Sequence, residues 1–315
     1  DENVIEILKE IICKGIEKKF TDINDHLIIT KVPAKHISAH EQWLPYVLGL
    51  KYYLRLKTHS LLVPLERIAK VNIGLFTLAN DFFILSEERK RTFRIENKFL
   101  RKIIVSPKEL KKPVVDSQLI NNYVLYCSKP KELLKGTNIL KYIEWGENLP
   151  VKIRGKNIIV HGYQNTPRIK KARRKPWYNL VPEIEKRCIK PILLPRRVYD
   201  RFLVAWNKNG VVASDNFILI EPRSENLLFP LLAVMNSTIT EYFVRVMSHL
   251  YGGGVCDLTP NIAKKIPIID LARLDIDMLL SLEKAFKGYI NTLDRTIIDE
   301  CVMRILSLMK REYVE

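Results

Sequence analysis

Apolar residues recur at helical spacing near both ends of the chain. Isoleucine and leucine residues three or four positions apart predict an amphipathic helix over Val4 to Phe20. His26 to Val32 follows as an isoleucine-rich strand that Pro33 closes. After Pro267 the pattern is helical again, and it predicts a long C-terminal helix, broken near Asn291, that packs on the body of the protein.

The middle of the chain, from about residue 65 to residue 269, has a different pattern of short β-rich runs between turn residues. The predicted strands are Val71 to Ile73, Phe82 to Leu85, Tyr123 to Tyr126, Asn157 to Val160, Leu203 to Trp206 and Asn216 to Ile220. The predicted helices are Pro130 to Leu134, Asn138 to Trp145 and Leu227 to His249. Because strands and helices do not strictly alternate, we expect an α+β fold with a mixed sheet.

Composition and charge indicate a folded, strongly basic protein. The chain has 315 residues, 47% of them hydrophobic, with 52 Lys and Arg against 35 Asp and Glu, for a formal net charge of +17. Such a surface attracts polyanions, so nucleic acid is the first partner to consider. The alternative is a basic proteome in which every protein has this charge, so clustering is more informative than the total.

The cysteines and the apolar runs indicate a protein of the reducing cytoplasm. Five cysteines lie far apart without a Cys-x-x-Cys pair, and we expect buried or free thiols: Cys13, Cys127, Cys188, Cys256 and Cys301. The longest apolar run, Leu227 to Met235, is far shorter than the roughly 20 residues that span a bilayer, so no membrane partner is expected. The chain opens without Met or a cationic leader, which suggests a piece of a longer protein.

Catalytic motifs are missing from the sequence. Methyl transfer to an exocyclic amine needs a glycine-rich cofactor turn and an Asn/Asp-Pro-Pro-Tyr/Phe loop, and neither occurs. The run Gly252 to Gly254 follows a helix rather than a strand, which argues against a nucleotide site. Asp116, Glu132 and Lys135 have only generic spacing for a metal-dependent nuclease, and His161 is typical of a turn. We therefore expect no catalytic residue, metal site or bound cofactor in this chain.

Two basic clusters are the strongest candidates for chemistry. The first joins cations to aromatic residues without an acid, and its candidate DNA contacts are Arg168, Lys170, Lys171, Arg173, Arg174, Lys175 and Tyr178. The second contains Arg196 and Arg197 near an acid. The alternative for the first cluster is a solvated charge run followed by a core aromatic pair, and the two readings overlap if Trp177 is buried beneath exposed cations. On that basis we expect Arg174→Ala to spare stability and to weaken binding.

Several segments, in order, resemble the target-recognition region of the TaqI-like adenine-specific DNA methyltransferases, a family that includes enzymes fused to a nuclease. Val71 to Leu85 is similar to its opening motif, a glycine and a short loop before Asn80-Asp81 and a hydrophobic strand. That loop usually carries Thr-Gly before the Asn, whereas Leu78 stands here in place of the glycine. Lys175 to Tyr178 resembles the family's basic-x-Trp-Tyr step, and Pro191 to Pro195 resembles the strand that follows it.

Four later segments continue this order. Ser214 to Ile220 resembles a polar step into a strand, and Leu232 to Thr238 resembles a helix that ends in Leu-Asn-Ser, at Asn236 and Ser237 in this sequence. The glycine turn Gly252, Gly253 and Gly254 and the closing Lys265 to Ile268 complete the series, which covers about 200 residues.

The resemblance implies a domain organisation and a partner. Residues 1–60 would be a linker or the tail of an upstream catalytic domain, residues 61–270 a DNA target-recognition domain, and residues 271–315 a C-terminal helical segment. The partners would be double-stranded DNA and a catalytic methyltransferase domain in cis or in trans, which would use S-adenosylmethionine. The alternatives are a separate specificity subunit, an RNA-binding protein and a metal-dependent nuclease; the sequence lacks an RNA-module signature.

Overall fold

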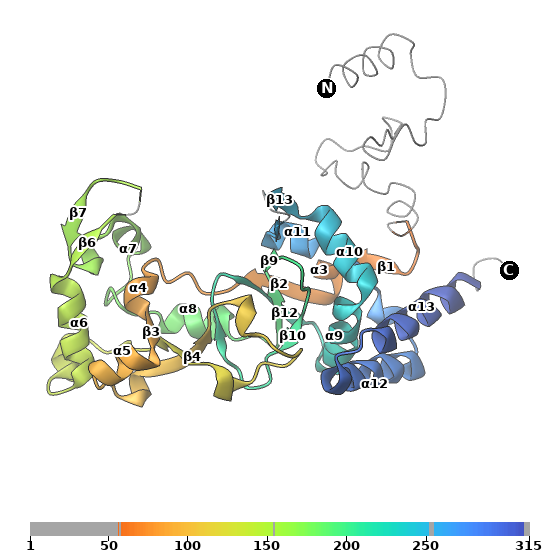
Figure 1. Ribbon diagram of the computed structural model, residues 1–315, viewed down its shortest axis with the longest axis horizontal. Coiled ribbons are helices and arrows are strands. Elements are labelled where there is room, and N and C mark those ends of the chain that lie inside the picture. The colour runs from red at the N-terminus through yellow and green to blue at the C-terminus, as the bar shows by residue number, and fades with distance from the viewer. Residues whose placement is uncertain (1–55, 57, 154, 252–254, 312–315) are drawn as a thin grey trace, which may run out of the picture. The chain divides into compact units, whose positions relative to one another are not determined.

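The computed structural model describes residue 56 and residues 58–153, 155–251 and 255–311 (Figure 1). The chain divides between His59 and Ser60 into two compact units, and the fold described below is that of the second unit. The helix and strand predicted at Val4 to Phe20 and His26 to Val32 lie outside the described residues. The second unit contains helices and mixed sheets that do not alternate regularly, so the predicted α+β class is confirmed.

Residues 75–189, which we call the aromatic-core region, pack around a cluster of rings. Its sheet has the order β11-β4-β5-β3, with the β11–β4 pair parallel and the other pairs antiparallel. The strands are β3 (Ile84–Ser86), β4 (Leu100–Ile104), β5 (Asn122–Leu125) and β11 (Val212–Ala213). Phe82 is buried at the centre, with its ring stacked on Tyr142 at 5.0 Å. Buried aromatic and aliphatic area of this kind is the main source of stability in such a core.

Helix α6 (Asn138–Asn148) shows how the sequence builds this region. Thr137 caps the helix by accepting the backbone N–H of Leu140, and the helix buries an apolar face that includes Tyr142. Gly146 lies where the Phe82 ring crosses, since a Cβ at this position would lie 2.3 Å from the ring. The glycine is therefore required for the close packing of α6 on α4 (Asn80–Phe83).

Residues 60–74 and 190–311, which we call the C-terminal region, contain the second four-stranded sheet. It is antiparallel in the order β10-β8-β12-β2. Its strands are β2 (Ala69–Ile73), β8 (Ile192–Pro195), β10 (Ala205–Trp206) and β12 (Phe217–Pro222). Strands β8 and β12 are almost entirely buried, which explains why the sequence shows them as continuous apolar runs rather than as alternation. Strand β11 comes from the same part of the chain but joins the sheet of the aromatic-core region, which links the two.

The helices of the C-terminal region lie together beside this sheet (Figure 1). They are α9 (Leu228–Asn236), α10 (Thr238–Met247), α12 (Ile276–Thr292) and α13 (Thr296–Arg311). Helices α12 and α13 form the predicted C-terminal helix with its break near Asn291, and this prediction is confirmed. The single helix predicted over Leu227 to His249 is wrong, because Ser237 caps a new helix and the chain bends by 69° between α9 and α10.

The strand predictions are confirmed in part. Val71 to Ile73, Tyr123 to Tyr126 and Asn216 to Ile220 lie in or overlap β2, β5 and β12. The prediction that Phe82 lies in a strand is wrong, since Phe82 belongs to the helical turn α4 and strand β3 begins only at Ile84. Among the described residues no single helix is long and apolar enough to cross a membrane, and only the bent pair Glu225–Asn236 and Thr238–Met247 passes that test together.

Candidate nucleic-acid interface

A groove with a volume of about 660 Å³ opens on the aromatic-core region. Three segments that are distant in the sequence form it: the loop at residues 76–81, the hairpin of β6 (Pro150–Lys152) and β7 (Ile159–His161), and the start of α7 (Pro167–Ala172). Figure 1 shows the hairpin beside α7, with its turn projecting away from the sheet. The resemblance motif around Asn80 and the first basic cluster therefore meet at one site.

The loop at residues 76–81 is held by close backbone packing at its start. Gly74 touches the neighbouring strand, since a Cβ there would lie 2.0 Å from the carbonyl oxygen of Ser214. The N–H of Leu75 donates to the carbonyl of Ala213 at 2.8 Å. Thr77 is buried, and its hydroxyl donates to the side-chain oxygen of Asn80 and accepts the N–H of Ala79 at 3.2 Å. Thr77 therefore orients the Asn80 amide at the groove.

Leu78 adopts a left-handed backbone conformation, with φ of 71°. An L side chain is disfavoured in this region of backbone space, where glycine is at home. Leu78 is the position at which the sequence departs from the Thr-Gly step of the family pattern. The turn therefore keeps a glycine-like conformation although the glycine itself is missing.

The groove offers acceptors and donors of the types that read base edges. Asn80, Asp81 and Asp215 line it from the loop side, and Arg168 lines it from α7. An amide can pair with adenine, a guanidinium with guanine, and a carboxylate with the amino group of cytosine. The two acids would repel phosphates, so this arrangement suits contacts with bases better than contacts with the backbone of a nucleic acid.

Helix α7 and its C-cap carry a cluster of cations, of which Arg168 lines the groove. Ile169 is buried and fixes the helix to the core, and Pro167 occupies its first turn. Arg168, Lys170, Lys171 and Arg173 are exposed, and none of these four makes an ion pair with another described residue. Exposed, mobile cations without an acidic neighbour are suited to phosphate contacts.

Arg174 belongs to the protein framework, and the expectation that its side chain is exposed is wrong. The side chain is only 7% exposed, and its Nε donates to Glu183 at 2.8 Å. Its two terminal nitrogens donate to the carbonyls of Thr77, at 2.9 Å, and Phe76, at 3.2 Å. Arg174 thus ties the basic segment to the loop at residues 76–81, and its guanidinium has no free edge for a base.

The aromatic pair after the basic segment is also part of the core. Tyr178 is fully buried, so its prediction as a direct DNA contact is wrong; its hydroxyl donates to the carbonyl of Lys129 at 2.8 Å, and burial raises its pKa to about 12. Trp177 is half-buried against Phe82 at 4.8 Å and donates from Nε1 to Glu147 at 2.8 Å. Lys175 remains exposed, as predicted for the cations beside the aromatic anchor.

The second basic cluster is arranged around a buried acid. Asp257 is 4% exposed, and its Oδ1 lies 3.3 Å from Nε of Arg196 and 3.5 Å from Nε of Arg197. These are ion pairs without hydrogen-bond geometry. The Arg197 side chain is more than half exposed, whereas that of Arg196 is mostly covered. The sequence places Asp257 sixty residues away from Arg197, so this partner was not predicted.

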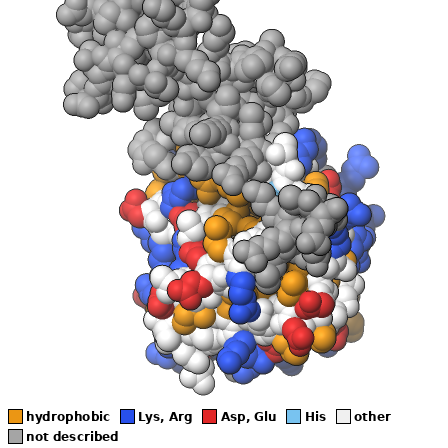
Figure 2. Space-filling view, turned by 90° about the vertical axis from the view of Figure 1, so that its right-hand side faces the viewer, with side chains coloured by type: hydrophobic (Ala, Val, Ile, Leu, Met, Phe, Trp, Pro, Cys, Tyr) orange, Lys and Arg blue, Asp and Glu red, His pale blue; other side chains and the backbone are white. Residues whose placement is uncertain are grey.

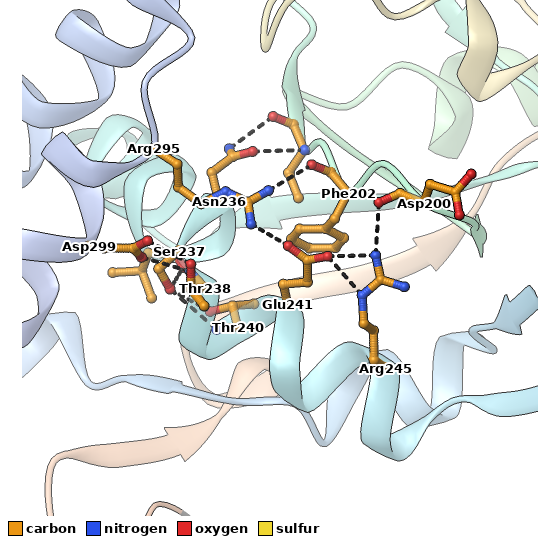
Figure 3. Close-up of polar contacts among 12 residues, drawn as sticks. Asp200, Phe202, Asn236, Ser237, Thr238, Thr240, Glu241, Arg245, Arg295 and Asp299 are labelled. Atoms are coloured by element: carbon orange, nitrogen blue, oxygen red, sulfur yellow. Dashed lines mark hydrogen bonds and ion pairs between the residues drawn. The ribbon is translucent and has the colours of Figure 1, made fainter. Parts of the chain in front are cut away.

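Asn236 and Ser237, taken from the resemblance, serve the fold (Figure 3). The buried Asn236 amide accepts the N–H of Val204 at 2.9 Å and donates to its carbonyl at 3.0 Å, which fixes that extended segment against α9. Ser237 is the N-cap of α10. Both side chains are buried and fully engaged, and this motif is structural in the region described. Gly252, Gly253 and Gly254 lie outside the described residues.

Several charges in the C-terminal region are paired around Glu241. Glu241 accepts from Arg245 at 2.8 Å and from Arg295, and Arg295 also donates to the carbonyl of Phe202 at 3.1 Å (Figure 3). Figure 2 views the side of the molecule on which α13 lies, and acidic and basic side chains alternate across it. Such mixed, paired charge neutralises the local field and offers less to a polyanion than α7 does.

The remaining residues that the sequence analysis considered for metal binding or acid–base catalysis do not form a catalytic group among the described residues. Asp116 accepts the backbone N–H of Gln118 at 2.9 Å, which caps a short helix, and His161 lies exposed on β7. No group of three or more His, Cys, Asp or Glu side chains in the described part of the chain is placed to hold a metal. Cys127, Cys256 and Cys301 are buried free thiols, as expected, and burial raises the pKa of Cys127 and Cys256.

Comparison with known proteins identifies the family. The family model described as the C-terminal domain of type II methyltransferase M.Eco57I matches residues 40–298. The chain belongs to this family. Type II methyltransferase M.AccI of Acinetobacter calcoaceticus is 27% identical over 271 residues, which cover 81% of this chain and 45% of that protein. The chain therefore spans about half the length of the curated relative.

Two solved structures are similar to this chain at low sequence identity. The type IIG restriction endonuclease BpuSI aligns with 75% of this chain and 27% of its own, at 12% identity and a TM-score of 0.53. The type IIL restriction-modification enzyme MmeI, solved in complex with DNA, covers 76% of this chain and 33% of its own, at 12% identity and a TM-score of 0.48. The first of these shows that the chain shares its fold with part of a type IIG restriction endonuclease.

Proposed function

We propose that this C-terminal domain of a type II methyltransferase recognises the DNA target sequence, as the specificity part of an adenine-specific, TaqI-like enzyme. The observation that carries the proposal is a groove that contains base-reading side chains and is lined by Arg168 of α7, with the exposed cations Lys170, Lys171 and Arg173 following on the same helix and at its C-cap. Cations anchor the phosphates, while the groove faces the base edges. The combination distinguishes specific recognition from general attraction to a polyanion.

Within the proposal the groove residues have separate roles. Lys170, Lys171 and Arg173 bind phosphates and fix the register of the duplex, whereas Arg168 and Asn80 face bases. Arg197 supplies a further phosphate contact from the C-terminal region, with Asp257 holding its guanidinium in place. Double-stranded DNA is favoured over RNA because amide, guanidinium and carboxylate side chains that suit the base edges of a duplex line the groove, with Phe76 as its one exposed aromatic lining residue among those described.

The methyl donor is assigned elsewhere in the full-length protein. S-adenosylmethionine is the donor expected for such enzymes, but the groove does not fit it. None of the described residues that line the groove is a glycine, so the groove lacks the glycine-rich turn that would hold this cofactor. Methyl transfer therefore belongs to a catalytic domain in the full-length cytoplasmic methyltransferase. The C-terminal domain described here directs that transfer to a DNA site.

The experiment that tests the proposal is DNA affinity of the full-length methyltransferase over a series of salt concentrations. The variant Lys170→Ala/Lys171→Ala removes two cations of α7 and should lower the slope of log K against log salt by about 1.8, at about 0.9 for each phosphate contact. The matched control is Lys284→Ala/Arg304→Ala, which removes two exposed cations from α12 and α13 and should leave the slope unchanged. Equal slopes for both variants would refute the interface.

A further inference from the structure

The β6–β7 hairpin is an isolated two-stranded ribbon. Lys152 pairs with Ile159 and Val151 with Val160, and no third strand joins this sheet among the described residues. A lone ribbon of this length is marginal in water unless one face is packed. Here Val151 packs against the aromatic core, and the N–H of Gly162 donates to the carbonyl of Leu149 at 2.8 Å at the base of the hairpin. The ribbon is therefore anchored at one end and projects at the other.

The projecting end is apolar although it is exposed. Ile159 is 65% exposed and lies on the outer face, opposite Lys152. Ile158, next to the turn, is 50% exposed. Isolated exposed aliphatic residues are common on protein surfaces. These two differ because both lie near the end of a protruding ribbon, one on each of its faces, and lysines at positions 152 and 156 flank them.

Charge and shape point to the same occupant. The major groove of DNA is wide enough to admit a two-stranded ribbon, and the thymine methyl is its one apolar mark. Lys152 and Lys156 on the ribbon and the cations of α7 across the groove match phosphates on either side. A protein partner could cover the same isoleucines, but an apolar protein surface would leave the surrounding lysines and Arg168 without a partner.

We propose that the β6–β7 hairpin enters the major groove of the target duplex and that Ile158 and Ile159 read thymine through its 5-methyl group. The inference rests on the proposed function, and it names the element that carries part of the sequence readout. Apolar contact with the methyl discriminates thymine from cytosine, which presents an amino group at the neighbouring ring position. The polar groove side chains would read the neighbouring base pairs.

The test uses the full-length methyltransferase and duplexes that carry its methylated sequence, identified by sequencing modified DNA. Each thymine in and beside the site is replaced in turn by uracil, which lacks only the methyl. The wild type should lose about fourfold in affinity at one or two positions, the equivalent of about 0.8 kcal/mol for one buried methyl-sized group. The variant Ile158→Ser/Ile159→Ser should bind thymine and uracil duplexes alike.

Two controls separate the hairpin from the rest of the interface. Leu133→Ser removes an equally exposed aliphatic side chain elsewhere in the region and should keep the preference for thymine. Lys170→Ala/Lys171→Ala should weaken both duplexes equally, and its lower salt slope supports the proposed function whatever the hairpin does. If the isoleucine variant keeps the full preference, or if the wild type has none, the hairpin proposal is overturned. A lower melting temperature of the isoleucine variant without a change in preference would assign the two isoleucines to the packing of the domain itself and overturn the proposal as well.

Discussion

Arginine and lysine serve different purposes in the two regions of this protein. In the C-terminal region Arg245 and Arg295 share Glu241 and bind backbone carbonyls, so their charge is used to hold helices and loops together. On α7 of the aromatic-core region and at its C-cap, four cations lie exposed and make no ion pair with a described residue. The difference shows that a basic cluster becomes a candidate interface only where the fold leaves its charges unpaired, and the number of cations alone does not decide it.

The aromatic core that carries α7 should depend strongly on Trp177. Its ring packs on Phe82 at 4.8 Å and its Nε1 donates to Glu147. We expect Trp177→Ala to lower the free energy of unfolding by about 3 kcal/mol, at the low end for large core residues because the ring is half-buried. Urea unfolding measures this loss. Trp177→Phe, which keeps most of the packing, should recover more than half of it, and equal losses for both variants would contradict a packing role.

Adjacent arginines allow the sharpest comparison of structural and exposed charge. Arg174→Ala removes three hydrogen bonds and leaves Glu183 without its partner, and it should cost about 2 to 3 kcal/mol of stability. Arg173→Ala should change stability by less than about 0.5 kcal/mol, because Arg173 is exposed. Both are measured by urea unfolding of the same chain. Similar costs at the two positions would break the distinction between framework and exposed cations.

The smallest expected effect concerns Leu78, which stands in the loop beside the groove where the family pattern has a glycine. Because φ is 71°, Leu78→Gly should be more stable than Leu78→Ala by about 1 kcal/mol. At Lys141, an exposed position inside α6, the order should reverse, with Ala favoured over Gly by about 1 kcal/mol. Thermal unfolding of the four variants gives both differences. The same order at both positions would show that the loop has no left-handed strain.

Sequence periodicity predicted the elements that depend on local pattern. Helix α6, the buried strand β12 and the break between α12 and α13 all follow from runs of apolar residues and their capping or turn residues. The break at Ser237 was missed because the apolar pattern continues across it. The cap depends on a single side chain, although serine before Thr238 was a visible signal.

The candidate site was harder to predict because its contacts join distant segments. The exposure of the cations in the first basic cluster was predicted, but on a loop and not on helix α7. The burial of Arg174 depends on the carbonyls of Phe76 and Thr77, almost one hundred residues earlier. The pairing of Asp257 with Arg197 likewise joins residues that are far apart in the sequence, so the sequence pattern did not predict it. Strand β6 was missed because it is only three residues long, although Gly155 with Lys156 and Asn157 between two apolar runs was a signal for a hairpin.

The central claim is that DNA lies on the aromatic-core region and not on α12 and α13. Photo-crosslinking of the full-length methyltransferase to its target duplex, with iodouracil in place of single thymines, tests it most directly when the crosslinked peptides are mapped by mass spectrometry. The account predicts crosslinks within residues 76–81, 150–161 and 167–173. Crosslinks concentrated on residues 276–311, with none in those three segments, would contradict it.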